Sequence, residues 1–103
     1  MLKRRFRMND VKLISKRSRQ IKPLVEAALA NELRLLETGI RQTEQRLQGF
    51  EKKHQMLTQD FISSYENDEI EETMEFAEWI GEFRMLKCLR EKAEALRDIK
   101  FAN

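Results

Sequence analysis

The sequence predicts an all-α protein, an antiparallel two-helix coiled-coil hairpin with a short corner helix and a basic N-terminal arm. Charged residues make up 37% of the chain, while glycine occurs three times and proline once. This balance is typical of long solvated helices rather than of a turn-rich β fold. Apolar residues also recur at helical spacing along two long segments, 29–50 and 76–99, which predicts two helices that bury one side each.

The chain has 103 residues, enough for one domain with a small core. Charge divides it into an N-terminal arm, residues 1–22, and a helical hairpin domain, residues 23–103. The arm holds nine Lys or Arg and one acid, whereas the rest holds eleven Lys or Arg and seventeen acids. Such asymmetry indicates a basic arm attached to a mildly acidic body.

Two interpretations of the arm stay open, a solvated, partly disordered leader and an electrostatic footprint for phosphates or an acidic protein surface. The sequence shows no helix-turn-helix turn, zinc spacing or aromatic RNA-binding signature, so binding would rest on attraction to the phosphate backbone. The residues expected to make such contacts are Lys3, Arg4, Arg5, Arg7, Lys16, Arg17 and Arg19.

The first long helix is predicted over residues 24–54, with its start at Pro23. Proline tolerates the first turn of a helix, and its fixed φ suits helix entry. The apolar side of this helix is a heptad seam with alternating spacings of four and three. The seam consists of Leu29, Leu33, Leu36, Ile40, Thr43, Leu47 and Phe50. A helix with one apolar side needs a partner.

A short corner helix and a second long helix follow. Thr58 is the predicted N-cap of the corner helix, residues 59–65, and Asn67 or Asp68 that of the long helix, which runs to about residue 100. Acidic residues in the first turns of this helix suit its dipole. They are Glu69, Glu71, Glu72, Glu75 and Glu78.

Folding the second long helix back onto the first pairs Phe50 with Trp79 and brings Lys52 and Lys53 close to Glu75 and Glu78. The two apolar stripes are wider than one helix–helix contact covers, and Met85 lies off the main seam. We therefore expect a homodimer with a four-helix core, or a partner protein that completes the core.

One constellation could bind metal. Glu51 and His54 form an E-x-x-H pair of the kind used in ferritin-like di-iron bundles, and Glu75 or Glu78 could complete it in a dimer. In ferritin-like chains, however, the lone Glu precedes this pair, and two lysines between Glu51 and His54 would repel a cation. The simpler interpretation is that His54 ends the first helix, where an imidazole suits the dipole. We expect no cofactor.

No enzymatic device is indicated. The chain has one histidine and one cysteine, and neither a Ser/His/Asp or Cys/His arrangement nor a glycine-rich phosphate loop is present. The lone Cys88 is predicted to be a small buried hydrophobe, since free cysteine is among the most often buried residue types. No apolar run approaches the roughly 20 residues that span a bilayer and no signal peptide is visible, so we expect a cytoplasmic protein without a membrane partner.

The corner carries a sequence pattern of its own. It reads Phe50-Glu-Lys-Lys-His54-Gln-Met-Leu-Thr-Gln-Asp-Phe61, and an acidic, Trp79-bearing helix follows. Over residues 29–99 the chain resembles small helical proteins of bacteria and archaea with an F-E-x-K-Y-G-M-x-x-x-x-F corner, many of them antitoxins encoded beside small toxins. It departs from them in having His54-Gln55 in place of Tyr-Gly and in its basic arm.

The resemblance implies a non-enzymatic protein–protein interaction module, antitoxin-like, that binds a cognate toxin through exposed apolar surface of the hairpin. Aromatic residues dominate such interfaces, so the expected anchors are Phe76, Trp79, Phe83 and Met85. The alternatives are a nucleic-acid-associated dimer that uses the basic arm, and a ferritin-like metal-binding dimer.

Overall fold

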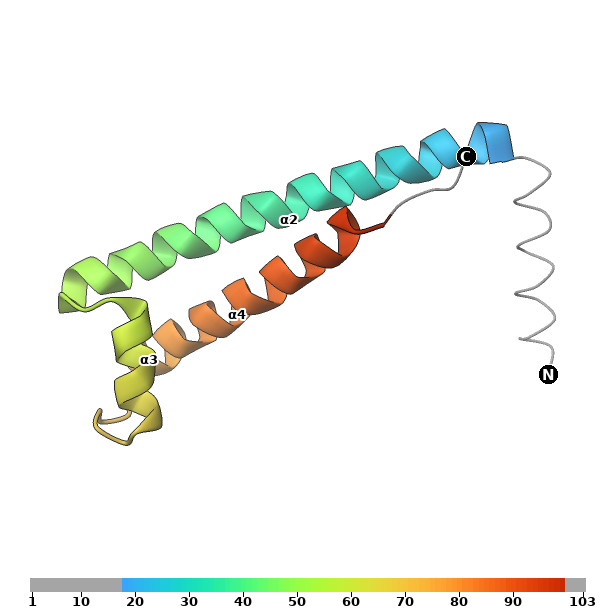
Figure 1. Ribbon diagram of the computed structural model, residues 1–103. Helices are drawn as coiled ribbons and strands as arrows, with labels where there is room; N and C mark the ends of the chain where they lie inside the picture. The colour runs from blue at the N-terminus through green and yellow to red at the C-terminus, as the bar shows by residue number, and fades with distance from the viewer. Residues whose placement is uncertain (1–17, 100–103) are drawn as a thin grey trace. The chain divides into compact units, whose positions relative to one another are not determined.

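The structure, a computed structural model, describes residues 18–99 (Figure 1). Over these residues the chain forms three helices and no strand: α2 (Ser18–His54), α3 (Thr58–Glu66) and α4 (Met74–Arg97). The predicted all-α class is therefore confirmed, as is the packing of the first long helix against the last. The chain divides into two compact units at the boundary between residues 32 and 33.

The described part of the first unit, residues 18–32, is the start of α2. The helix begins at Ser18 and contains Pro23, so the prediction that it starts at Pro23 is wrong. Pro23 is the sixth residue of α2, so the helix lacks the bond that an N–H at this position would make to the carbonyl four positions earlier. Residues 1–17 of the predicted basic arm lie outside the described residues.

In the second unit, α4 lies alongside residues 33–54 of α2, and α3 lies at the end where the chain turns (Figure 1). Among the described residues, ion pairs of Lys or Arg with Glu join the two long helices: Lys53–Glu75 at 2.7 Å, Arg46–Glu82 at 2.9 Å, Arg90–Glu44 at 2.6 Å and Arg97–Glu37 at 3.0 Å. Residue numbers rise along α2 as they fall along α4, so the helices run in opposite directions.

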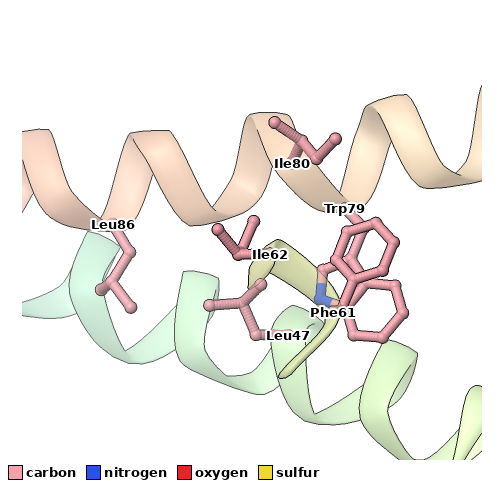
Figure 2. Close-up of a cluster of buried hydrophobic side chains, with 6 residues drawn as sticks. All are labelled: Leu47, Phe61, Ile62, Trp79, Ile80 and Leu86. Atoms are coloured by element: carbon pink, nitrogen blue, oxygen red, sulfur yellow. The ribbon is translucent and has the colours of Figure 1, made fainter. Parts of the chain in front are cut away.

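The seam of α2 faces α4. Leu36, Thr43 and Leu47 are buried, and Phe50 stacks on Trp79 with ring centroids 5.4 Å apart, as the fold-back predicts. The main core lies near the corner and consists of Leu47, Phe61, Ile62, Trp79, Ile80 and Leu86 (Figure 2). Toward the other end, the buried apolar residues are Leu36 and Ala93.

The corner between α2 and α3 uses a left-handed residue. Helix α2 ends at His54, as predicted, and Gln55 follows with φ 53°. The Met56 N–H then donates to the Glu51 carbonyl at 3.2 Å. A left-handed residue with a bond back over the last turn is a common way to end a helix, and glycine usually occupies that position.

The caps of α3 and α4 differ from those predicted. Thr58 is the first residue of α3 rather than its N-cap, and its backbone N–H donates to the Glu51 carboxylate at 2.8 Å. Helix α4 starts only at Met74, where the Thr73 hydroxyl accepts from the Phe76 N–H at 3.0 Å. Asn67 and Asp68 instead close α3, with Asp68 left-handed at φ 57°.

Three of the glutamates expected in the first turns of α4 therefore lie in the connection before it. Glu69, Glu71 and Glu72 belong to the non-helical segment between α3 and α4, and Glu75 is the acidic residue of the first turn. The chain needs this segment because the turn at Asp68 ends α3 and the half-buried Ile70 packs against the core.

The prediction of a buried Cys88 is wrong, since the thiol is exposed. It lies on the side of α4 away from the buried residues Trp79, Leu86 and Ala93. In a helix, residues two, five or nine positions apart point to roughly opposite sides, so Cys88 cannot share their face. Within residues 18–99, no helix is both long enough and apolar enough to cross a membrane.

Candidate functional site

The four predicted anchors do not form one surface. Trp79 is fully buried at 0% exposure, so it belongs to the core of the chain and does not reach a partner. Phe76 and Phe83 are half-buried and pack against the same core. Met85 alone among the four is well exposed, at 51%.

Trp79 joins the three helices. Its ring stacks on that of Phe61 from α3 with centroids 3.9 Å apart and an interplanar angle of 4° (Figure 2). The ring of Phe50 from α2 stacks at 5.4 Å. The indole Nε1–H donates to the Thr58 hydroxyl at 3.0 Å. A buried indole costs free energy unless its N–H has a partner, so Thr58 lets a fully buried tryptophan occupy the corner.

Met85 lines a groove between α2 and α4 with a volume of about 690 Å³. We call it the glycine groove, because Gly49 from α2 and Gly81 from α4 both border it. Its other lining residues are Arg46, Phe50, Lys53, Glu75, Glu78 and Glu82. Apart from the chain neighbours and the backbone of the same helix turn, no atom lies within 4 Å of the position that a Cβ would take at either glycine. The helix backbone at Gly49 and Gly81 is therefore open to the groove, because neither residue has a side chain to cover it.

Ion pairs form the two ends of the glycine groove. Arg46 bonds Glu82 at 2.9 Å, and Lys53 bonds Glu75 at 2.7 Å. The Lys53 ammonium, together with the His54 imidazole, lowers the pKa of Glu75. Each end is thus a bridged pair of opposite charges, and the apolar part between them is supplied by Phe50 and Met85.

Phe83 lines a separate groove of about 510 Å³, together with Leu47, Leu57, Thr58 and residues of α4. Leu57 is 63% exposed there. The predicted anchors are therefore divided between a buried core, this second groove and the glycine groove. The glycine groove combines an exposed anchor, Met85, with open backbone.

The E-x-x-H pair does not converge on a metal position. Glu51 is directed to the backbone N–H of Thr58 at 2.8 Å, and His54 lies against Glu75 with Nε2 to Oε2 at 3.2 Å. Within residues 18–99, no group of three or more His, Cys, Asp or Glu side chains is placed to hold a metal ion. In the described conformation Glu51 instead stabilises the start of α3, because a carboxylate at a helix N-terminus interacts favourably with the helix dipole.

His54 is held among aromatic rings. Its imidazole stacks on Trp79 with centroids 5.4 Å apart and meets Phe76 edge-on at 5.2 Å. The Nε2 atom is buried and lies 3.2 Å from the Glu75 carboxylate, without a well-aligned hydrogen bond to any of the described residues. His54 thus belongs to the aromatic corner.

The chain was compared with protein-family models, curated proteins and solved structures. None matches it. The residues themselves therefore carry the functional argument.

Most of the predicted nucleic-acid contacts cannot be placed. Lys3, Arg4, Arg5, Arg7, Lys16 and Arg17 lie outside the described residues. Arg19 lies in the first turn of α2, and its side chain is exposed. Nucleic-acid binding by these residues therefore remains a prediction from the sequence.

Sequence reasoning missed the two glycines that define the groove. Gly49 and Gly81 interrupt helices at a cost of roughly 1 kcal/mol each relative to alanine, and neither lies on the seam. The signal was present in the fold-back, because an antiparallel arrangement that pairs Phe50 with Trp79 also places residue 49 near residue 81. The missed role of Glu51 had no such signal, since its bond to Thr58 depends on the corner geometry.

Proposed function

We propose that this chain is a non-enzymatic protein–protein interaction module, antitoxin-like, whose glycine groove binds a segment of a partner protein. The observation that carries the proposal is the pair of glycines. Gly49 and Gly81 border one groove from two different helices, and the space above both is open. Small residues on facing helices let a third element approach the backbone closely, which is how helices often dock into helical proteins.

The chemistry of the groove favours an amphipathic helix as the segment bound. Phe50 and Met85 supply apolar surface for the buried side of such a helix, while the Arg46–Glu82 and Lys53–Glu75 pairs supply a polar rim. This arrangement of an apolar centre and a charged rim is typical of protein interfaces.

The corner geometry supports the antitoxin-like part of the proposal. The family pattern has glycine at the position of Gln55, and Gln55 takes the left-handed conformation, φ 53°, that glycine adopts most readily. The backbone at this corner is thus the one that the family's sequence pattern favours, although the residue differs. By this likeness the partner is a toxin encoded beside this chain, in the cytoplasm.

The test is capture of the product of the neighbouring gene by the full chain, together with protection of cells that express that product. Gly49→Arg fills the groove and is expected to abolish both effects. Gln45→Arg, at an exposed position of α2 that does not line the groove, is the matched control and is expected to retain both. Circular dichroism checks that both variants fold. Absence of capture and protection by the unchanged chain would contradict the proposal.

Charge segregation favours a second candidate function, binding of nucleic acid by the basic N-terminal residues. The first 22 residues hold nine Lys or Arg and one acid. Binding through phosphates makes affinity fall steeply with salt. Removal of residues 1–17 is expected to lower both the affinity for DNA and its salt dependence, and no change in either would reject this function.

A further inference from the structure

Helix α4 has a second face, on the side away from its buried residues Trp79, Leu86 and Ala93. Along it, four small or apolar residues repeat at intervals of seven positions, and all four are exposed: Met74, Gly81, Cys88 and Ala95. A parallel line beside them, also at intervals of seven, is exposed as well: Glu78, Met85 and Lys92. We call these two lines the outer face of α4.

Seven-residue spacing keeps side chains on one side of a helix and is the pattern of helices that pack along their length. The opposite side of α4, which includes Trp79, Leu86 and Ala93, is already buried within the chain. A helix with apolar residues on both sides requires a second contact. The outer face of α4 is thus exposed surface with the spacing of a helix that packs along its length.

We propose that α4 packs antiparallel against α4 of a second copy of this chain, about a two-fold axis near Met85. The line of Glu78, Met85 and Lys92 is self-complementary about Met85, and the line of Met74, Gly81, Cys88 and Ala95 is self-complementary about a point half a residue before it. Met74 then faces Ala95 of the second copy, and Gly81 faces Cys88 of the second copy. In each layer a larger side chain meets a smaller one, as close helix packing requires.

Charge selects the antiparallel direction. Glu78 and Lys92 lie seven positions before and after Met85, so a two-fold axis at Met85 places each Glu78 against Lys92 of the second copy. A parallel arrangement in the same register would instead place glutamate against glutamate and lysine against lysine. The antiparallel arrangement also opposes the two helix dipoles favourably.

The proposal does not rest on the function proposed for the glycine groove. The two surfaces share Glu78, Gly81 and Met85, whereas Gly49 lines the groove alone and Lys92 belongs to the outer face alone. Variants of Gly49 and of Lys92 therefore separate the two proposals.

Charge reversal tests the arrangement on the full-length chain by sedimentation equilibrium. The unchanged chain is expected to dimerise. Glu78→Lys alone and Lys92→Glu alone each place like charges together twice in the dimer, so each is expected to weaken dimerisation roughly tenfold or more. The double variant, and an equimolar mixture of the two single variants, restore opposite charges and are expected to recover the dimer.

Disulfide trapping tests the register. In Gly81→Cys the new thiol faces the native Cys88 of the second copy, so mild oxidation is expected to give a covalent dimer. Positions 81 and 88 of one helix are about 10 Å apart along the axis, too far for a disulfide within the chain. Gln45→Cys, with Cys88 retained, is the matched control and is expected to form a covalent dimer far more slowly.

A chain that stays monomeric at all concentrations would overturn the proposal, and so would a dimer that the double charge reversal fails to recover. Trapping no faster in Gly81→Cys than in the control would overturn the register. If dimerisation behaves as described and Gly49→Arg still captures the neighbouring gene product, the groove proposal fails while this one stands. Conversely, if Gly49→Arg abolishes capture and the unchanged chain is monomeric, the groove proposal stands and the dimer proposal fails.

Discussion

The indole Nε1–H of Trp79 donates a 3.0 Å hydrogen bond to the hydroxyl of Thr58, 21 positions earlier in the chain and likewise buried. The bond ties the first turn of α3 to the first half of α4. It also explains why Thr58 is not a helix cap, since its hydroxyl serves the tryptophan.

Thr58→Val removes this acceptor while keeping the shape of the side chain. The buried indole N–H is left without a partner, so the free energy of unfolding should fall by about 1–3 kcal/mol. Urea unfolding followed by tryptophan fluorescence measures the loss cleanly, because Trp79 is the single tryptophan of the chain. Thr58→Ser keeps the hydroxyl, and a loss of equal size in that variant would show that the hydrogen bond is not the cause.

Gln55→Gly should stabilise the chain. Gln55 has φ 53° at the end of α2, and glycine takes this conformation without the steric penalty of a side chain, so a gain of about 1 kcal/mol is expected. Thermal unfolding by circular dichroism measures it. The same exchange inside a helix, Gln45→Gly, should instead cost about 1 kcal/mol, and a shared sign in the two variants would contradict the prediction.

Glu75 should contribute to the loss of stability in acid. Its pKa in the folded chain is lowered by Lys53 and His54, so its contribution is fully present above the unfolded-state pKa and is lost as the pH falls through the folded pKa. Glu75→Gln should therefore reduce the fall in unfolding free energy between about pH 6 and pH 3. Glu94→Gln controls for the loss of one exposed carboxylate, and an equal change in the two variants would refute the prediction.

Tyr65 should titrate above its ordinary range. The charge of Glu72 is the main cause, and its carboxylate also accepts a 3.2 Å hydrogen bond from the Tyr65 hydroxyl, so the pKa of Tyr65 is raised. Its contribution to stability is present below the unfolded-state pKa and is lost as the pH rises through the folded pKa.

Phenolate absorbance follows this titration directly, since Tyr65 is the single tyrosine. Glu72→Gln should lower the pKa of Tyr65. Glu69→Gln removes a neighbouring acid that makes no bond to the hydroxyl, and it should have the smaller effect. A Tyr65 titration unchanged by Glu72→Gln would show that Glu72 does not set it.

The heptad seam predicted the packing of α2 on α4, because a side chain's place on a helix follows from spacing alone. It therefore predicted the Phe50–Trp79 contact, which the structure shows. It also placed Lys52 and Lys53 near Glu75 and Glu78, and of these the structure pairs Lys53 with Glu75. Spacing could not predict which polar group bonds which at the corner, where Glu51 and Trp79 both bond Thr58. Those partners depend on how α3 sits.

The candidate site was harder to predict for a related reason. Aromatic content suggested Trp79 as an anchor, but the largest aromatic side chain of a small core is also the one that the core buries most completely. Cys88 was misplaced because α4 is apolar on two sides, and composition does not say which side faces α2. The glycine groove depends on the absence of side chains at residues 49 and 81. Neither residue belongs to the heptad seam, so the seam does not predict the groove.

The ion pairs between α2 and α4 have a kinetic consequence. Arg46–Glu82 joins residues 36 positions apart, whereas Arg97–Glu37 joins residues 60 positions apart, and a longer loop costs more entropy to close. We therefore expect contacts between α2 and α4 to form first at the aromatic corner and then progressively farther from it. Amide hydrogen exchange should accordingly be slowest around Leu47 and Trp79 and fastest around Glu37 and Arg97. The end farthest from the corner can thus open and close many times during the life of one folded molecule.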